Sequence, residues 1–345
     1  MTPFDGPNMR RPQPRPPGWR AVAAVAGVVA IGLFAVVSLN FQRDLAEART
    51  ATLGRSRVID SPWGSIEYAD IGSGPAVLFI HGSGGGFDQA LAFGTPLAGR
   101  GVRIIAPSRF GYLRSAMPDG ATPEMQADAL DWLMRRLGIQ EAVIFGGSAG
   151  ALSATQLALR HPERCRGLVL AVPALHAPDR LPGANAAPNP ATQRAIDAAL
   201  GSDLLFWTGI RAAPDFMTRM VLATDPAVVR AAPAAEQARV REAMFGILPV
   251  SARREGLRMD SATAGRPPPL PVEQIACPTL VMAARGDLYE TDKAAIHTAK
   301  RIPGARLVLY PDGGHLWVGH DAELWSTVSV FIDELESDRT ARPRA

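Results

Sequence analysis

Cysteine and histidine are both scarce in this chain. Only two cysteines and six histidines occur among 345 residues. Two cysteines are too few for the disulfide framework of a small secreted domain. The histidines are dispersed and the cysteines lie far apart in the sequence, so no set of residues has the spacing of metal ligands. We therefore expect no metal site.

An excess of charge of one sign is also missing from most of the chain. The net charge is +3. All of it comes from the first forty residues, which carry Arg10, Arg11, Arg15, Arg20 and Asp5. Residues 41–345 are therefore neutral overall. A nucleic-acid-binding protein needs a basic face, so the sequence predicts no nucleic-acid partner.

Motifs that bind nucleotide cofactors are absent as well. The glycine-rich segment at 82–86 is not followed by the Lys-Ser/Thr pair of a phosphate-binding loop. It also lacks the acidic residue that a dinucleotide-binding fingerprint places on a following strand. We therefore expect no cofactor.

One uncharged run stands out near the N-terminus. No charged residue lies between Arg20 and Arg43, and residues 21–39 are almost wholly apolar. As a helix this run would be roughly 28 Å long, close to the hydrocarbon thickness of a bilayer. The preceding arginines and Trp19 favour a signal anchor over 21–40, with a cytoplasmic N-terminus and an extracytoplasmic, periplasmic catalytic domain. A cleaved signal peptide and a buried core helix are the alternatives.

Strand-like and helix-like patterns alternate beyond residue 56, which is typical of a mostly parallel sheet covered by helices. An antiparallel pair is predicted across the turn "SPWG". Helices are predicted at 124–138 and 322–336. Buried strands are predicted at 76–80, 102–107, 141–146, 166–173, 278–285 and 305–313.

The alternation stops between residues 174 and 276. This region has a proline-rich start, several helical patterns and a closing run "RPPPLP". We interpret it as a helical insertion that divides a core made of 56–173 and 277–336. Residues 1–20 are predicted to be a disordered basic segment, 41–55 a linker helix and 337–345 a disordered tail.

Small residues surround one serine in the segment "VIFGGSAGALSATQ". Where a strand turns sharply into a helix, the residue at the apex is strained, and its neighbours two positions away must be small. Gly146 and Gly150 meet this demand around Ser148. The sequence therefore predicts Ser148 as a nucleophile, with the backbone N–H of Ala149 facing a developing oxyanion.

A second glycine-rich segment, "HGSGGG", directly follows the predicted strand at 76–80. Its glycines would let the backbone bend so that an N–H points at the Ser148 site. One such donor contributes ~3–4 kcal/mol to transition-state stabilisation.

A carboxylate and a histidine follow two later strands, each after glycine. Asp287 lies in "ARGD" and His315 in "DGGH". His315 would accept the Ser148 proton, and Asp287 would orient the imidazole. Asp312 is an alternative carboxylate, although it lies in the same turn as His315. The other histidines considered lack a supporting motif or lie elsewhere: His161, His176, His297 and His320.

These motifs together resemble the serine-dependent α/β-hydrolase superfamily with a helical cap. The resemblance covers residues 56–336 and rests on "HGSGGG", "SRFGYLRS", "GGSAG", "ARGD" and "GGHLWVGH". It implies an eight-stranded, mostly parallel sheet with helices on both faces and a cap inserted after the sixth strand. It also implies that Ser83 and Ala149 supply the oxyanion N–H groups. Ser108 stands where the family often has aspartate, which leaves any role of that aspartate in doubt.

The fold that this resemblance implies places Cys165 and Cys277 before neighbouring parallel strands, about 5 Å apart. A disulfide between them and a pair of buried thiols both remain open. The substrate is expected to lie under the cap. The candidate pocket residues are Gly84, Phe206, Trp207, Met217 and Trp317.

The predicted function is a membrane-anchored hydrolase of a carboxylic ester or a related small acyl compound. A serine nucleophile argues against the alkyl-enzyme chemistry of relatives that use aspartate. The same triad also serves C–C bond, amide or N-terminal peptide, lactone and perhydrolase chemistry. A ligand-binding member of the fold without catalysis is the alternative from another class.

Overall fold

The computed structural model describes residues 18–180, 194 and 197–341. The chain divides into two compact units, one ending at Ala46 and one beginning at Glu47. Each is described by itself.

A single helix, α1 (Gly18–Thr52), makes up the described part of the first unit and continues into the second. It is long and apolar enough to cross a membrane, and its most apolar window is not buried against other residues of the described chain. The predicted anchor at 21–40 and the predicted linker at 41–55 therefore form one uninterrupted helix as far as Thr52.

The second unit is built on the predicted eight-stranded sheet, with strand order β1-β2-β4-β3-β5-β6-β7-β8. β2 pairs antiparallel with β1 and β4, and the other neighbours are parallel. The strands are β1 (Arg57–Ser61), β2 (Gly64–Ile71), β3 (Ala76–Ile80), β4 (Arg103–Pro107), β5 (Ala142–Gly147), β6 (Cys165–Ala171), β7 (Thr279–Ala284) and β8 (Arg306–Tyr310).

Helices cover both faces of this sheet, because its central strands are apolar on both sides. One face packs against α2 (Phe87–Ala98) and α12 (Asp321–Ala341). The other packs against α3 (Pro123–Arg136), α4 (Gly150–Arg160) and α11 (Thr291–Arg301). The carboxyl ends of the parallel strands are left to carry the functional loops.

Local signals in the sequence fix some helix ends well. Thr122 caps α3, because its hydroxyl accepts a hydrogen bond from the Met125 N–H at 3.2 Å.

The C-terminal segment of the chain was predicted less well. The helix α12 continues to Ala341, so most of the segment expected to be a disordered tail at 337–345 is helical.

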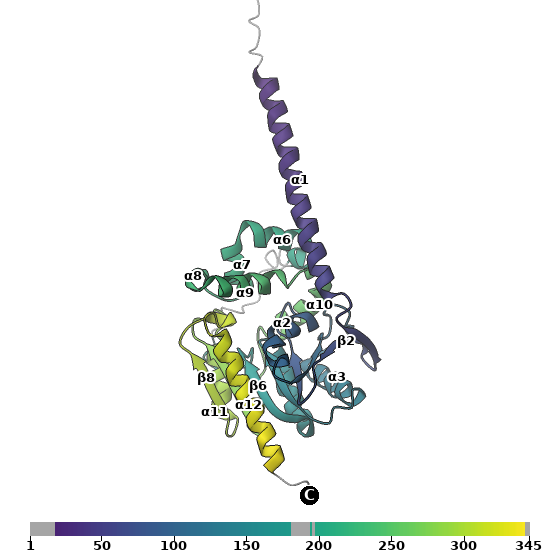
Figure 1. Cartoon of the computed structure of the whole chain (residues 1–345), viewed down its shortest axis with the longest axis vertical. Helices are drawn as coiled ribbons and strands as arrows, with labels where there is room; N and C mark the ends of the chain where they lie inside the picture. Colours follow the sequence, from purple (N-terminus) through teal and green to yellow (C-terminus); the bar gives the residue numbers. More distant parts are fainter. Residues whose placement is uncertain (1–17, 181–193, 195–196, 342–345) are drawn as a thin grey trace, which may run out of the picture. The chain divides into compact units, whose positions relative to one another are not determined.

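The insertion between β6 and β7 is helical, as predicted, and lies over one end of the sheet (Figure 1). It contains α6 (Asp203–Ala212), α7 (Pro214–Val221), α8 (Pro226–Ala231), α9 (Ala234–Phe245) and α10 (Arg254–Thr263). The first helical pattern of the insertion, over 191–210, is not one continuous helix, and part of it lies outside the described residues. α6 begins only at Asp203, because Ser202 caps it by accepting from the Leu205 N–H.

The two cysteines lie side by side at the amino ends of β6 and β7, the edge of the sheet opposite the carboxyl ends that carry Ser148. Cys165 begins β6, and Cys277 stands shortly before β7. Their sulfur atoms are 2.8 Å apart, and both are free thiols in this structure.

Candidate active site

Ser148 lies at the sharp turn between β5 and α4. Its φ angle is +50°, a strained value for a residue with a side chain. A Cβ at Gly146 would lie 2.6 Å from the Ala154 Cβ, and one at Gly150 would lie 2.4 Å from the His81 carbonyl oxygen. Both flanking positions therefore require glycine, for the steric reason anticipated from the sequence.

His315 is brought to this serine by the loop after β8. Its Nε2 lies 2.9 Å from the Ser148 Oγ, although the two residues are 167 positions apart. Gly313 and Gly314 precede it with φ angles of +109° and +63°. These angles favour glycine and allow the chain to turn the imidazole back over the sheet edge.

Asp287 completes a hydrogen-bonded chain of three side chains. Its Oδ2 lies 2.8 Å from the His315 Nδ1 and also accepts a hydrogen bond from the Thr291 hydroxyl. Its Oδ1 accepts from the Tyr289 N–H at 2.8 Å. The carboxylate is thus buried and held by donors on both oxygens, which fixes the orientation of the imidazole.

The alternative groups have other partners. Asp312 is 72% exposed and lies 2.7 Å from the His320 Nε2. His161 contacts Asp128 at 2.8 Å, beyond the far end of α4. The rings of His176 and His297 pack against each other, with centroids 6.0 Å apart.

Two backbone N–H groups beside Ser148 are available to a ligand. Within the described part of the chain, neither the Ser83 N–H nor the Ala149 N–H donates a hydrogen bond. Their neighbours are engaged: the Gly82 N–H donates to the Gln89 Oε1 at 3.0 Å, and the Gly84 N–H donates to the Tyr112 hydroxyl oxygen at 3.3 Å. These bonds fix the shape of the loop and leave the Ser83 N–H as the donor that is free to bind a ligand.

His81, at the start of this loop, is fully buried and structural. Burial, together with the nearby Arg109 guanidinium, holds its pKa well below the ordinary value. Its Nδ1 lies 2.7 Å from the Gly82 carbonyl oxygen, and its Nε2 accepts from the Arg109 N–H at 2.9 Å. These contacts assign the neutral tautomer that carries its proton on Nδ1.

A cavity of about 870 Å³ opens above Ser148. Its lining includes the expected Ser83, Gly84, Ala149, Phe206, His315 and Trp317. Trp207 and Met217 do not line it, so their assignment to the pocket was wrong. Both are buried inside the cap instead. Met217 faces Gly209 of α6, because a Cβ at Gly209 would lie 3.0 Å from its sulfur.

Several residues at the site were missed by the sequence interpretation. Tyr289 lines the cavity and packs its ring edge-on against His315, with centroids 5.2 Å apart. Burial and the charge of Asp287 raise the pKa of Tyr289 to about 12. Arg180 also lines the cavity, and burial lowers the pKa of its guanidinium. No local motif identifies either residue.

Ser108, which departs from the family pattern, has a local structural role. Its hydroxyl donates to the Glu67 Oε2 at 3.1 Å and accepts from the Phe87 N–H at 3.0 Å. It thereby ties β2 to the first turn of α2. Ser108 is buried, and its hydroxyl both donates and accepts a hydrogen bond within the core.

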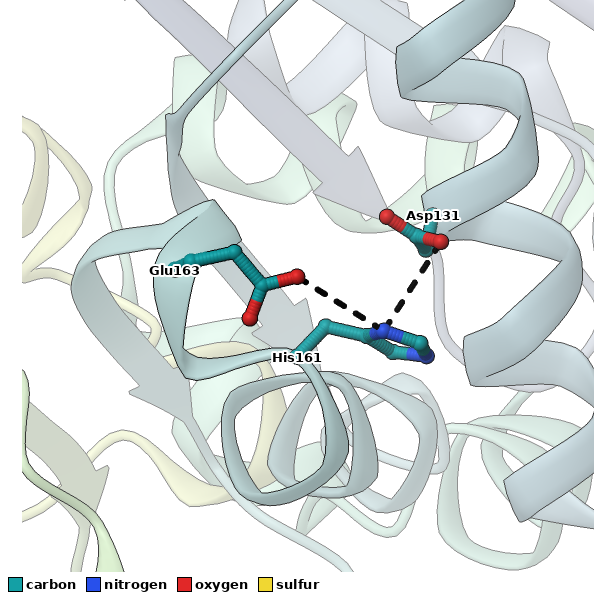
Figure 2. Close-up of side chains that lie close together, drawn as sticks. All are labelled: Asp131, His161 and Glu163. Atoms are coloured by element: carbon teal, nitrogen blue, oxygen red, sulfur yellow. Dashed lines mark ion pairs between the residues drawn. The ribbon is translucent and has the colours of Figure 1, made fainter.

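Figure 2 shows the side chains of Asp131, His161 and Glu163 close together. His161 directly follows α4, whose first turn lies beside Ser148, so this cluster is at the other end of that helix. Their ligand atoms lie within 4.8 Å of one another. However, Asp131 already pairs with Arg164 at 2.7 Å and with Arg135 at 2.7 Å. The cluster is therefore part of an ion-pair network between α3 and the segment before β6, and we assign it no metal.

Comparison with known proteins agrees with this geometry. The family model described as the alpha/beta hydrolase fold matches residues 75–318. The first three curated relatives are matched over less than half of their own length, at 30–33% identity. The 2-hydroxymuconate semialdehyde hydrolase of Pseudomonas sp. is 27% identical over 274 residues, which cover 78% of this chain and 90% of the relative.

Solved structures share the whole fold. An alpha/beta hydrolase fold protein from Nakamurella multipartita is 26% identical with a TM-score of 0.63, covering 81% of this chain and 98% of that one. A thermophilic esterase from Thermogutta terrifontis has a TM-score of 0.60 at 24% identity, covering 82% and 99%. With the family match spanning most of the chain, this protein belongs to the α/β-hydrolase fold family.

Proposed function

We propose that this protein is a hydrolase that cleaves a carboxylic ester or a related acyl compound through an acyl-enzyme on Ser148. The observation that carries this proposal is the continuous hydrogen-bonded chain from the Ser148 Oγ through His315 to Asp287. A hydroxyl at its ordinary acidity is a weak nucleophile, and an adjacent oriented base activates it.

In the first half of the reaction, the Ser148 Oγ attacks the acyl carbon while its proton passes to the His315 Nε2. Asp287 keeps the proton on Nδ1 and stabilises the imidazolium that forms. The proton then passes to the leaving alcohol, and the acyl group stays on Ser148. In the second half, His315 takes a proton from a water molecule as its oxygen attacks the acyl carbon. The bond to the Ser148 Oγ then breaks, His315 returns the proton to that oxygen, and the carboxylic acid leaves.

The Ser83 and Ala149 N–H groups bind the oxyanion in both halves. They lie on either side of Ser148, on the loop after β3 and at the start of α4, and have no other acceptor in the described chain. The dipole of α4 adds positive potential at Ala149. Loss of one such donor costs a typical hydrolase ~3–4 kcal/mol of transition-state stabilisation.

A panel of p-nitrophenyl esters of graded acyl length tests the proposed reaction on the full chain. We expect turnover that Ser148→Ala abolishes, together with covalent labelling of Ser148 by a fluorophosphonate. Labelling of the Ser148→Ala variant at the original rate would contradict the assignment.

Cleavage of a C–C bond is the second candidate. It is favoured by the full-length similarity to the hydrolase of 2-hydroxymuconate semialdehyde, which spans 90% of that relative. The same triad and oxyanion donors would serve it. Incubation with 2-hydroxymuconate semialdehyde, followed by loss of its conjugated absorbance, distinguishes this activity from ester cleavage.

We further propose that α1 anchors the enzyme in a membrane with its N-terminus in the cytoplasm. The support is its apolar length and the arginines that precede it. Resistance to extraction at alkaline pH tests the anchor. Protease digestion of sealed vesicles of known orientation tests the extracytoplasmic position of the catalytic domain.

A further inference from the structure

A carboxylate of the cap reaches into the core beside the oxyanion loop. Asp260 lies on α10, and its side chain is 4% exposed. Its two oxygens lie 2.7 and 2.6 Å from the Nη1 and Nη2 atoms of Arg109. Its Oδ2 also accepts from the Tyr112 hydroxyl at 2.5 Å and from the Ser83 hydroxyl at 2.8 Å.

All of these donors come from the core rather than the cap. Ser83 belongs to the loop after β3, while Arg109 and Tyr112 belong to the loop after β4. Tyr112 also accepts the Gly84 N–H. Asp260 thus holds the side chain of Ser83 directly and the next peptide through Tyr112.

The pairing of Asp260 with Arg109 is required by burial. Removal from water works against the charged form of Arg109, but the charge and hydrogen bonds of Asp260 outweigh it and raise the guanidinium pKa. A buried guanidinium without this partner would be strongly unfavourable. The pair of Asp260 and Arg109 is therefore one of the buried ionic contacts that fix the cap on the core, together with that of Arg253 and Asp88.

We propose that Asp260 is a positioning residue for the oxyanion hole, so that the hole is complete only when the cap is seated. This inference rests on the function proposed above. The hydroxyl of Ser83, bonded to Asp260, fixes the rotation of the peptide whose N–H faces the cavity. Tyr112, which accepts the N–H of the next residue, Gly84, fixes the other side of the same turn.

Two variants separate positioning from folding without leaving Arg109 unpaired. Ser83→Ala removes the bond to Asp260 but keeps the backbone N–H. Tyr112→Phe removes the bonds to Asp260 and Gly84, and Tyr112 is not part of the cavity lining. We expect each to lower kcat about tenfold per fluorophosphonate-titrated site, with KM changed less than twofold and Tm by only a few degrees.

The matched controls lose a hydroxyl elsewhere. Tyr310→Phe removes a buried hydroxyl that has no hydrogen-bond partner in the described structure, and Ser251→Ala removes a bond within the cap, to Asp203. Both should keep the parental kcat. Ser83→Thr, which restores a hydroxyl, should recover most of the kcat lost in Ser83→Ala. The double variant Ser83→Ala/Tyr112→Phe should lose less than the product of the single losses.

The outcomes distinguish this inference from the proposed function. If Ser148→Ala is inactive but Ser83→Ala and Tyr112→Phe match their controls, Asp260 has no positioning role. A fall in Tm with unchanged kcat per titrated site would also overturn it, since that would be a purely structural effect. If Ser148→Ala remains active, the proposed function itself fails.

A separate observation concerns the two thiols at the amino ends of β6 and β7. We infer that Cys165 and Cys277 form a disulfide in an oxidising compartment. Their sulfurs are 2.8 Å apart, closer than non-bonded contact, and Cys277 is partly exposed to an oxidant. The bond would join the two core segments between which the whole cap is inserted.

The reaction is thiol–disulfide exchange with a small disulfide such as oxidised glutathione. The Cys277 thiolate attacks one glutathione sulfur and expels a glutathione thiolate. The Cys165 thiolate then attacks the Cys277 sulfur and expels the second. The hydrogen bond from Cys165 lowers the pKa of Cys277, which suits it to the first attack. Two protein protons leave with two reduced glutathiones.

Intact mass and thiol titration of the full chain test this step. After incubation with oxidised glutathione we expect a loss of about 2 Da, no titratable thiol and a higher Tm, all reversed by dithiothreitol. Cys165→Ser should instead retain a mixed disulfide on Cys277. Two free thiols persisting in the oxidised wild-type sample would overturn the inference.

Discussion

The two sides of the cavity are built in different ways. Ser148, His315 and Asp287 all stand on loops at the ends of core strands and contact one another directly. The Ser83 loop is also held by core side chains, but the Ser83 hydroxyl itself donates to Asp260 of the cap. The triad is therefore a property of the sheet, whereas the oxyanion side is shared between core and cap.

This difference has a functional meaning. The triad must be preorganised whether or not substrate is present, and strand ends provide that rigidity. In the proposed mechanism, the oxyanion donors are needed only when a substrate lies under the cap. If Asp260 positions them as proposed, seating of the cap over a substrate also completes the groups that stabilise the transition state.

The largest effect is expected on the triad side. Ser148→Ala should lower kcat for p-nitrophenyl acetate by about 10⁶-fold, because the attacking atom is lost. Ser153→Ala, a buried serine further along α4, is the matched control and should keep its activity. Comparable losses in the two variants would mean that α4 as a whole, rather than one hydroxyl, supports turnover.

Loss of the orienting carboxylate should be the next largest effect. Asp287→Asn should lower kcat by about 10⁴-fold, because the amide favours the wrong imidazole tautomer. Asp312→Asn, at the exposed alternative carboxylate, should change kcat less than twofold. Steady-state kinetics at neutral pH measure both, and a reversed ranking would assign the triad to Asp312.

The start of α4 at Gly150 packs directly against the backbone of His81, so an added methyl group at Gly150 should lower the stability of the fold. Gly150→Ala places a Cβ 2.4 Å from the His81 carbonyl oxygen, so we expect a loss of stability of about 3 kcal/mol or more. Gly147→Ala is the matched control, because its nearest neighbour would lie 3.7 Å away. Chemical denaturation measures both, and equal stability would contradict the packing described here.

Within the cap, Phe206 and Trp207 should behave differently although they are adjacent. Phe206→Ala enlarges the cavity and should shift the preference toward longer acyl chains by several-fold in kcat/KM. Trp207→Ala should cost ~3–5 kcal/mol of stability and leave the preference unchanged. The ester panel and thermal unfolding measure these effects. A shift in acyl-chain preference in Trp207→Ala would show that Trp207 contacts the substrate after all.

The smallest effect expected is a pH dependence from His81. Because its pKa is lowered in the folded protein, the unfolded chain binds a proton that the folded chain excludes. Stability should therefore fall as the pH drops below about 6.5, by up to ~1.4 kcal/mol per pH unit. Denaturation of wild type and His81→Gln between pH 7.5 and 5 should show a shallower slope in the variant. If the free energy of unfolding depended on pH equally in both proteins, His81 would not be the source of the dependence.

The sequence was sufficient to predict the features that depend on local backbone conformation, because such conformations require particular residue types such as glycine. The glycines around Ser148 indicate the turn, and the strand-Gly pattern before Asp287 and His315 places both residues at strand ends. The sheet followed from apolar runs separated by helical periodicity.

The cap was less predictable for an equally physical reason. Its helices carry apolar residues on more than one face. Phe206 and Trp207 therefore look alike in the sequence, although Phe206 lines the cavity and Trp207 does not. Asp260 could not be found at all, because its partners Arg109 and Tyr112 lie about 150 positions away and meet it only after folding.

Trapping of the acyl-enzyme is the decisive experiment on the role of Ser148. A slowly deacylating p-nitrophenyl ester should add the mass of one acyl group to the full chain, and peptide mapping should place it on Ser148. The adduct should be absent in Ser148→Ala. An acyl group found on another residue, or turnover of the ester with no acyl group ever bound to the chain, would contradict the account.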